Sequence, residues 1–508
     1  MNGFKIFTLV AAAALGSAYA FAVSDDTPTS SRDSIFSYSA EAQATFSTGN
    51  HTPLWLAANK FGLSSQRPNY GILRAGVFRH MDYKPRFSWS AAVDLATGYD
   101  LTSPFVIQQL YGAVRWRCLQ LTVGAKEHTE KFVDEKLSSG DLLQSPNARP
   151  IPQVRAEMPN YEIVPYTNRW LAVKAHVSFG LFTDSHWQHS WVNMELPGAK
   201  RSVHRLYHSK ALYIRVGRED KFPLSFEGGL QMAAQFGGSV YKRSFYPPYE
   251  LELIKMPNGW KHWGKVLIPT GGDQGGGSGL IGEETNVTGN HTGEWSAALK
   301  WDDKERNWSA RLYYQHFFED HSMMFFDHTW RDMLLGIELK FPDNPIASKF
   351  VYEYLNTRDQ SGPIYWDHTS LIPEQVSGRD DYYNHYLDVG SSHWGYGMGN
   401  PLLISPIYNA DHELYFYHNR IKGHHIGVEG CPSSQLSYRM LLTLWRSWGT
   451  YNIPTSNIAH SFSALWELNY HPARLNGWSG TLGIGLDAGA LLSPSFGVQV
   501  SIKKTGWI

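Results

Sequence analysis

The chain has 508 residues and nearly balanced charge, with 45 Lys and Arg against 46 Asp and Glu. This balance leaves no basic excess for collecting phosphates, so we expect no nucleic-acid partner. Aromatic residues make up 14% of the chain, while its mean hydropathy is slightly negative. Apolar residues must therefore be interleaved with polar ones along much of the chain.

The first residues are typical of a secretory signal peptide. Lys5 lies in a short basic head, an apolar run follows over Ile6–Leu15, and an Ala-Tyr-Ala cleavage site comes next. The run is too short to span a bilayer, which disfavours an N-terminal membrane anchor. We expect a signal peptide over residues 1–20, with cleavage after Ala22 as the second choice.

Many later stretches alternate between apolar and polar side chains with the period of a β-strand. Between Trp170 and Phe182 the apolar side chains fall at odd positions, whereas Lys174, His176 and Ser178 fall on the other face. Ser461–His471 repeats this pattern. No stretch after the signal has the continuous apolar length of a membrane helix, so any crossing of a membrane is expected to use strands.

Aromatic residues at the ends of the apolar faces distinguish a membrane barrel from a soluble β-sandwich, whose strands also alternate between apolar and polar residues. Trp308 and Trp478 open apolar faces, and Phe318 and Tyr470 close them. Aromatic girdles at both lipid interfaces have this arrangement in transmembrane barrels. Together with export, the pattern favours an outer-membrane barrel, with a secreted β-sandwich or propeller as the alternative.

The predicted connections alternate between short turns and long loops, as outer-membrane barrels require. Short ones fall at residues 84–85, 117, 218–221, 302–306, 342–345, 432–434 and 472–476, and long ones at 127–168, 185–207, 237–292, 319–331, 357–393 and 448–460. Two long gaps in succession, on either side of Trp170–Phe182, would break the alternation. A further strand is therefore expected between Lys126 and Trp170.

The best candidate for this strand follows the proline-containing stretch LSSGDLLQSPNARPIPQVR, which we interpret as a loop leading into a strand. In IPQVRAEM, Val154 and Ala156 share one face, and Arg155 and Glu157 share the other. Its prolines lie at the strand start, where a missing N–H donor does least harm.

The predicted fold is all-β, a transmembrane antiparallel β-barrel of about 18 strands (range 16–20). Residues 21–508 are expected to form this single outer-membrane domain, with a lumen closed by loops and short helical segments. One short helix is predicted over Pro53–Gly62 because proline suits a first turn and glycine a helix end. Cys118 and Cys431 are interpreted as ordinary strand residues, although one long-range disulfide between them is left open.

No motif predicts a metal, a cofactor or an enzyme activity. His424 and His425 are adjacent on a predicted strand and point to opposite faces, so they cannot share a metal ion. The acidic and histidine cluster lacks zinc-ligand spacing and is interpreted as a polar loop; it comprises Glu319, Asp320, His321, Asp327 and His328. There is no nucleophile elbow and no phosphate loop. A glycosidase carboxylate pair carries no local motif, so a barrel enzyme is left as a less favoured possibility.

The predicted loops are rich in residues suited to sugars, because flat aromatic rings stack on pyranose C–H faces. The aromatic residues of these loops are Trp187, Trp191, Trp260, Trp263, Tyr365, Trp366 and Trp394. About half of them are expected to pack in the aromatic girdles or in the plug instead of binding sugar. Arginine forks can bind the carboxylates of acidic sugars. The candidate saccharide-binding residues are Asn147, Arg149, Arg155, Trp187, Trp191, Tyr365, Trp366, Asp359 and Arg439.

Two interpretations of the arginines are equally favoured. Arg149, at a barrel rim, and Arg155, projecting inward, could bind sugar carboxylates. They could instead pair with Asp141 or Glu157 and fix the loop, since arginines in a barrel lumen are usually paired.

Several ordered blocks resemble the Wzi family of outer-membrane capsule-assembly proteins. They are LSSGDLLQSPNARPIPQVR, HSKALYIRVG, YEYLNTRDQSGP, and DDYYNHY followed by GMGNPLL, and the resemblance runs from about Ser34 to the end. It implies a roughly 18-stranded barrel closed by loops, acting as a surface lectin for capsular polysaccharide. The chain departs from the family by showing little sign of a long N-terminal helical bundle and by placing Trp507 second from the end.

The expected function is an outer-membrane, lectin-like protein that binds capsular polysaccharide and assembles or anchors it at the cell surface. Expected partners are the polysaccharide, outer-membrane lipid and the polysaccharide-export machinery. The alternative is a channel for sugars or small solutes, which the degree of lumen closure would distinguish.

Overall fold

The computed structural model describes residues 35–508 except 219, 269–288, 320–323, 325–329 and 367–374. The predicted signal peptide lies outside the described residues. Eighteen strands form one sheet: β1 (Phe36–Thr48), β2 (Asn69–Arg79), β3 (Phe87–Tyr99), β4 (Phe105–Trp116), β5 (Leu119–Ala125), β6 (Gln153–Ile163), β7 (Leu171–Leu181), β9 (Leu206–Val216), β10 (Leu224–Phe236), β13 (Asn290–Asp303), β14 (Trp308–Glu319), β15 (Met333–Lys340), β16 (Lys349–Asn356), β21 (Ile421–Ser433), β22 (Leu436–Gly449), β23 (Pro454–Tyr470), β24 (Trp478–Gly489) and β25 (Ser495–Trp507).

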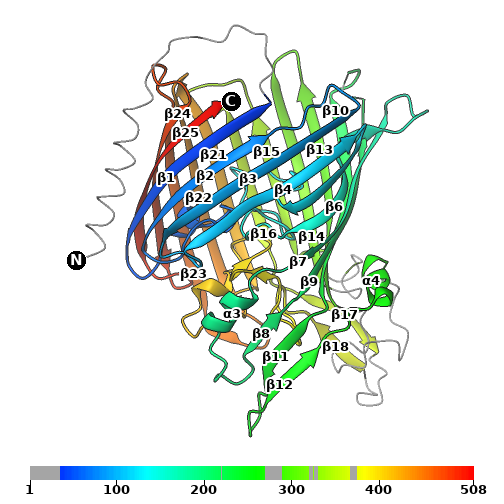
Figure 1. Ribbon diagram of the computed structural model, residues 1–508, viewed down its shortest axis with the longest axis vertical. Coiled ribbons are helices and arrows are strands. Elements are labelled where there is room, and N and C mark those ends of the chain that lie inside the picture. The colour runs from blue at the N-terminus through cyan, green and yellow to red at the C-terminus, as the bar shows by residue number, and fades with distance from the viewer. Residues whose placement is uncertain (1–34, 219, 269–288, 320–323, 325–329, 367–374) are drawn as a thin grey trace.

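The sheet closes on itself as an antiparallel barrel (Figure 1). Its last strand, β25, pairs with β1 from Ser37↔Trp507 to Thr48↔Phe496. Closure removes the free sheet edges, which is the condition for a β-structure to span lipid. The prediction of an all-β barrel of about 18 strands is confirmed. No helix among the described residues is long and apolar enough to cross a membrane.

One end of the barrel carries short turns, and the other carries the long loops, as in outer-membrane barrels, whose long loops are extracellular (Figure 1). The loop end also has short turns at 100–104, 450–453 and 490–494, so the long loop predicted at 448–460 is wrong. The missing strand is β6. It is followed by a short turn over residues 164–170, which the sequence pattern did not predict. Pro159 lies inside β6, where the pairing with β7 shifts register between Met158 and Glu162. A proline is tolerated in a strand at such a bulge.

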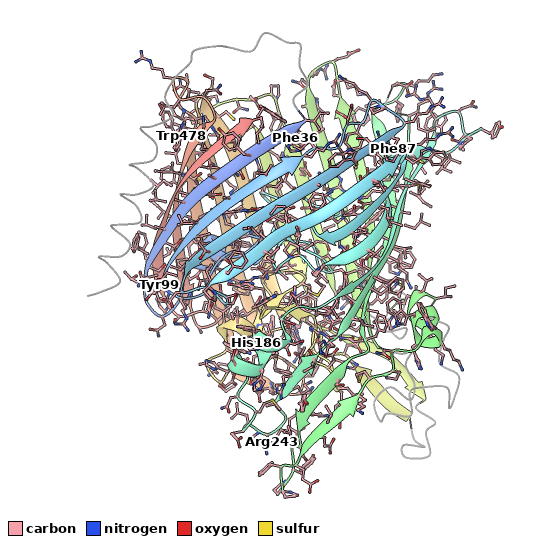
Figure 2. All side chains as sticks on the ribbon, viewed as in Figure 1. Phe36, Phe87, Tyr99, His186, Arg243 and Trp478 are labelled. Atoms are coloured by element: carbon pink, nitrogen blue, oxygen red, sulfur yellow. The ribbon has the colours of Figure 1, made fainter. Side chains whose placement is uncertain are left out.

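The two faces of the wall follow the predicted alternation. In β6 the Val154 side chain is exposed outward, whereas Arg155 and Glu157 are buried against the lumen contents. Figure 2 shows aromatic residues at both ends of the wall, with Trp478 near the short turns and Tyr99 near the long loops. The aromatic girdles are therefore present. Phe318 does not belong to one, because it is buried with its ring over the backbone of Gly293.

The long loops carry the remaining elements. A three-stranded sheet projects beyond the barrel together with two helices (Figure 1); the loop elements are α2 (Leu54–Ala57), α3 (Ser185–Trp191), β8 (Lys200–Val203), β11 (Ser239–Arg243), β12 (Leu251–Lys255), α4 (Trp260–Leu267), β17 (Ser361–Trp366), β18 (Gln375–Arg379), β19 (Ser392–His393), β20 (Tyr396–Gly397) and the 3-10 helix η2 (Pro406–Tyr408). The helix predicted over Pro53–Gly62 forms only over α2. Cys118 lies in the turn after β4 and not in a strand, while Cys431 lies in β21, and both are free thiols.

Candidate functional site

Three long segments fold back into the lumen and form a plug, which we define as residues 49–68, 126–152 and 380–420. Most of their side chains are buried. The short helix α2 is held against the wall because Leu54 N donates to Asp487 Oδ2 at 2.8 Å and Trp55 Nε1 donates to Thr443 Oγ1 at 3.0 Å. The segment 126–152, which contains the proline-containing stretch, lies at the centre of the plug.

Carboxylates of the wall bind the backbone of segment 126–152. Glu353 of β16 accepts hydrogen bonds from Ser138 Oγ at 2.5 Å, from Ser139 N at 2.7 Å and from the Tyr313 hydroxyl at 2.7 Å. His425 of β21 lies 2.9 Å from the Leu137 carbonyl oxygen. Buried polar groups need such partners, so these bonds determine where the segment crosses the lumen.

A second contact pairs two carboxyl groups, Asp141 of the plug and Glu294 of β13. The Gln315 side-chain amide donates to both at 2.6 Å, and Leu143 N donates to Asp141 Oδ1 at 2.9 Å. Burial raises the pKa of Asp141, and the donors around it only partly offset this. Two buried carboxyl groups that share one donor favour sharing a proton over being charged together.

The third plug segment covers the second. Tyr383 donates its hydroxyl hydrogen to the Leu142 carbonyl oxygen, and Asn400 Nδ2 donates to Ser139 Oγ at 3.0 Å. Ser145 Oγ donates to the Gly399 carbonyl oxygen at 2.5 Å. Beside Glu130 and Asp141 a cavity of only about 10 Å³ remains, which is close to the space of a single water molecule. The predicted closure of the lumen by loops and short helical segments is confirmed.

Asn147 and Arg149 lie inside this plug and not at its rim, which corrects the predicted position. Asn147 Nδ2 donates to the Gly397 carbonyl oxygen at 3.0 Å. The Arg149 guanidinium lies 4.3 Å from the Trp394 ring centroid and donates to Thr102 Oγ1 at 2.5 Å. Burial lowers the pKa of Arg149 to about 10, and the predicted pairing with Asp141 does not form. Both side chains are thus occupied within the protein.

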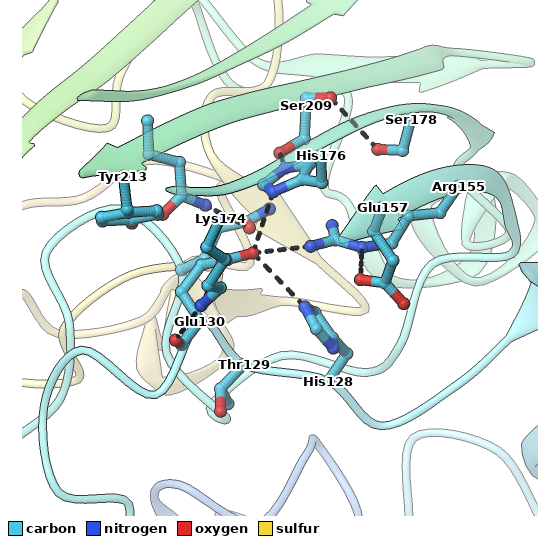
Figure 3. Close-up of polar contacts among 12 residues, drawn as sticks. His128, Thr129, Glu130, Arg155, Glu157, Lys174, His176, Ser178, Ser209 and Tyr213 are labelled. Atoms are coloured by element: carbon cyan, nitrogen blue, oxygen red, sulfur yellow. Dashed lines mark hydrogen bonds and ion pairs between the residues drawn. The ribbon is translucent and has the colours of Figure 1, made fainter. Parts of the chain in front are cut away.

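Arg155 belongs to an ionic cluster between plug and wall (Figure 3). Its guanidinium lies 2.6 Å from Glu130 and 2.7 Å from Glu157, so the predicted pairing with Glu157 is confirmed. Lys174 Nζ and His176 Nδ1 approach Glu130 to 3.0 and 3.1 Å. Burial alone would raise the pKa of Glu130, but His176 and Arg155 outweigh it and hold that pKa well below its usual range.

Arg439 projects into the lumen as predicted but lies toward the end of the barrel that carries the short turns. Its Nη2 donates to Glu467 Oε2 at 2.9 Å, and its Nη1 donates to the Lys136 carbonyl oxygen at 2.9 Å. Lys60 also approaches Glu467, at 3.8 Å. Arg155 and Arg439 both hold plug segments to the wall.

Two other candidates, Trp187 and Trp191 of α3, stack with His412 of the third plug segment in a column of rings that we call the aromatic platform. The Trp187 and Trp191 rings stack with centroids 5.0 Å apart, and Trp191 stacks on His412 at the same distance. Trp394 lies beside Trp187 at 6.3 Å. The column leads from a buried ring, Trp187, to an exposed one, His412.

Hydrogen-bonding groups border the exposed end of the platform. Tyr417 donates to Asp411 Oδ2 at 2.7 Å and lies 2.9 Å from Glu413 Oε2, and these carboxylates flank His412 in the chain. Asn193 N donates to the His412 carbonyl oxygen at 3.3 Å, which ties the loop to the end of α3. The platform thus combines flat rings with acceptors that suit sugar hydroxyl groups.

The remaining candidates are not assembled there. Trp260 and Trp263 belong to α4, which packs on the outside of the barrel. Asp359 donates its backbone N–H to Asp332. Tyr365 and Trp366 lie in the β17–β18 hairpin, with side chains outside the described residues. His412 and Glu130 were missed because their partners are distant in sequence.

One serine–histidine–carboxylate series lies in the ionic cluster among the described residues: His176 Nε2 lies 2.8 Å from Ser209 Oγ, His176 Nδ1 lies 3.1 Å from Glu130, and all three side chains are buried. No group of three or more His, Cys, Asp or Glu side chains there could hold a metal ion. His425 is buried and His424 is exposed on the opposite face, as predicted. Of the acidic and histidine cluster, only Glu319 lies among the described residues, and it accepts a hydrogen bond from Tyr383 N at 2.5 Å.

Comparison with known proteins supports the fold. No family model and no curated protein matches this sequence. Among solved structures, the chain is similar to Wzi of Escherichia coli, described as an outer membrane protein involved in group 1 capsule assembly and a carbohydrate-binding β-barrel: 12% identity, 91% of this chain and 83% of that chain covered, TM-score 0.53. OccAB4 of Acinetobacter baumannii matches at 9% identity over 93% of this chain and 98% of that one, with TM-score 0.45. At such identities the likeness shows the fold alone, and the protein has the fold of an outer-membrane β-barrel.

Proposed function

We propose that this barrel is a surface carbohydrate-binding protein that binds polysaccharide through its extracellular loops and does not conduct solutes. The observation that carries the proposal is the stacked column Trp187–Trp191–His412 above a closely packed plug. Stacked rings with an exposed end suit a pyranose face, and the plug fills the space that a channel would need. The carbohydrate binding described for Wzi, a structure of similar fold, is consistent with this proposal.

The chemistry of the platform favours sugar units without a negative charge. Asp411 and Glu413 would repel a uronic acid but accept hydrogen bonds from neutral hydroxyl groups. The Arg149 guanidinium lies 4.3 Å from the Trp394 ring centroid and donates to Thr102 Oγ1. Charged units of a capsular polysaccharide would bind elsewhere on the protein, while the platform binds the neutral units.

The proposed role is to hold capsular polysaccharide at the cell surface, with the export machinery supplying the chain. Binding without turnover is proposed, because the platform offers ring faces and acceptors but no nucleophile held by a base. The channel for small solutes is the competing function, and conductance separates the two.

The test uses the assembled barrel with purified capsular polysaccharide. Trp191→Ala should weaken binding by about 2 kcal/mol or more, as truncation of a tryptophan that carries binding does. Trp260→Ala is the matched control, since Trp260 is 88% exposed on α4 outside the barrel. The same preparations should give no steady conductance in planar bilayers. Equal binding by both variants, or an open channel in the unaltered protein, would overturn the proposal.

A further inference from the structure

A large hollow marks the outer, lipid-facing wall of the barrel. It has a volume of about 1170 Å³ and extends over strands β3 to β14. This exceeds the typical size of pockets for drug-sized ligands, about 300–1,000 Å³. Because it is part of the wall that faces the hydrocarbon core, its occupant must enter from the membrane.

Small outward side chains line the hollow among larger apolar ones. Ala156, Ala175 and Ala297 point outward from β6, β7 and β13, and Trp116 and Trp295 also line the hollow. Small residues on the lipid face leave a recess that flexible hydrocarbon chains can fill by dispersion contacts. The hollow spans strands spaced about 4.8 Å apart, so it is wide enough for several chains side by side.

The amphipathic helix α4 borders the hollow at the extracellular end. It packs on the outer wall through Val266, which is fully buried beside Phe236. Lys210 points outward from β9 and donates to the carbonyl oxygens of Val266 and Leu267 at 3.2 and 2.6 Å. The helix contains no acidic residue, and its Lys261 is exposed. It therefore presents positive charge at the level of lipid headgroups.

A second extracellular segment borders the hollow beside α4. Trp295 Nε1 donates to the Met324 carbonyl oxygen at 2.8 Å, and the Tyr314 hydroxyl donates to the Trp330 carbonyl oxygen at 2.8 Å. The next residue, Arg331, is exposed and lies 5.5 Å from the Trp330 ring centroid. Both extracellular borders of the hollow thus carry an exposed cation.

We propose that this hollow is a binding site for a phosphate-bearing lipid of the outer leaflet that has several acyl chains. Its chains occupy the recess over Ala156 and Ala175, and its phosphates bind Lys261 and Arg331. Continuity with the lipid-facing wall and the charge of the extracellular border identify a lipid as the occupant.

The test measures lipid retained by the purified full-length protein, using native mass spectrometry after incubation with diphosphoryl lipid A or with phosphatidylcholine. Ala156→Trp and Ala175→Trp fill the recess and should weaken lipid A retention by about tenfold, as expected when two methylenes lose apolar contact. Ala464→Trp is the matched control, because Ala464 also faces outward but lies on β23, away from the hollow. Lys261→Gln with Arg331→Gln should reduce retention of lipid A without changing that of phosphatidylcholine.

Heat-modifiable mobility on gels confirms that each variant is assembled before its lipid content is compared. Equal retention of the two lipids by the unaltered protein would overturn the proposal. So would equal losses in Ala175→Trp and Ala464→Trp, or a cross-linked dimer through the hollow that excludes lipid.

Discussion

Glu130 and Arg155 meet at 2.6 Å where the central plug segment lies against the barrel wall. Both side chains are almost fully buried, and Lys174 and His176 complete the surroundings of the carboxylate (Figure 3). A buried ion pair adds little net stability over apolar packing, but removal of one partner leaves a charge without compensation. The cluster therefore fixes the position of the plug.

Arg155→Ala should destabilise the folded barrel by about 3–5 kcal/mol, because Glu130 would remain buried and poorly compensated. The measurement is the urea midpoint of unfolding in detergent. Arg155→Ala combined with Glu130→Gln should recover part of the loss. If both variants unfold like the unaltered protein while losing polysaccharide binding, Arg155 acts in binding and its structural role here is wrong.

The same cluster predicts a loss of stability in acid. The folded pKa of Glu130 lies below its unfolded value, so its contribution is present above the usual carboxyl range and disappears as pH falls through the folded pKa. Unfolding midpoints measured between neutral and acidic pH should fall for the unaltered protein. Glu130→Gln should flatten that dependence, and an unchanged pH profile would contradict the assignment.

Asp141 predicts the opposite dependence, because burial raises its folded pKa above the unfolded value. Its contribution to stability is full below the usual carboxyl range and is lost as pH rises through the folded pKa. The unfolding midpoint of Asp141→Asn should therefore fall less than that of the unaltered protein as the pH rises through this range. A steeper decline in Asp141→Asn would show that the charged form is the one the plug requires.

Glu353→Ala should loosen the plug, because it leaves Ser138 Oγ, Ser139 N and the Tyr313 hydroxyl without their shared acceptor. Each buried unsatisfied donor costs about 1–3 kcal/mol. Planar-bilayer recordings should then show channel openings that the unaltered protein lacks. Glu353→Gln keeps one acceptor oxygen and should open less often; a silent Glu353→Ala barrel would mean that other contacts suffice.

The sequence pattern predicts that Leu468 and Ile484 face lipid and that Asn469 faces the lumen. Ile484→Arg should cost about 2–4 kcal/mol if it lies near the bilayer midplane. Leu468→Arg should cost less, because Leu468 is two residues from the turn end of β23. Asn469→Arg should be milder still, since Asn469 already lies 3.4 Å from Glu467. Unfolding midpoints of the three variants give the order, and equal losses would indicate a register error.

The sequence alone determined the class of fold, because alternation with a period of two is a local property of each strand. It assigned Arg155 to the lumen face and Val154 to the lipid face, and the alternation of turns and loops predicted the strand β6. The turn at residues 164–170 was not predicted, because Pro159 and the bulge around it interrupt the alternating pattern of β6.

Only the tertiary structure decided what the loops do. Arg149 and Trp394 are separated by hundreds of residues but lie 4.3 Å apart, and no local pattern encodes such a pairing. The aromatic platform also depends on a loop near His412 returning to α3. Loop closure of this kind depends on the summed contacts of the plug and the barrel wall, which become visible only when the chain is folded.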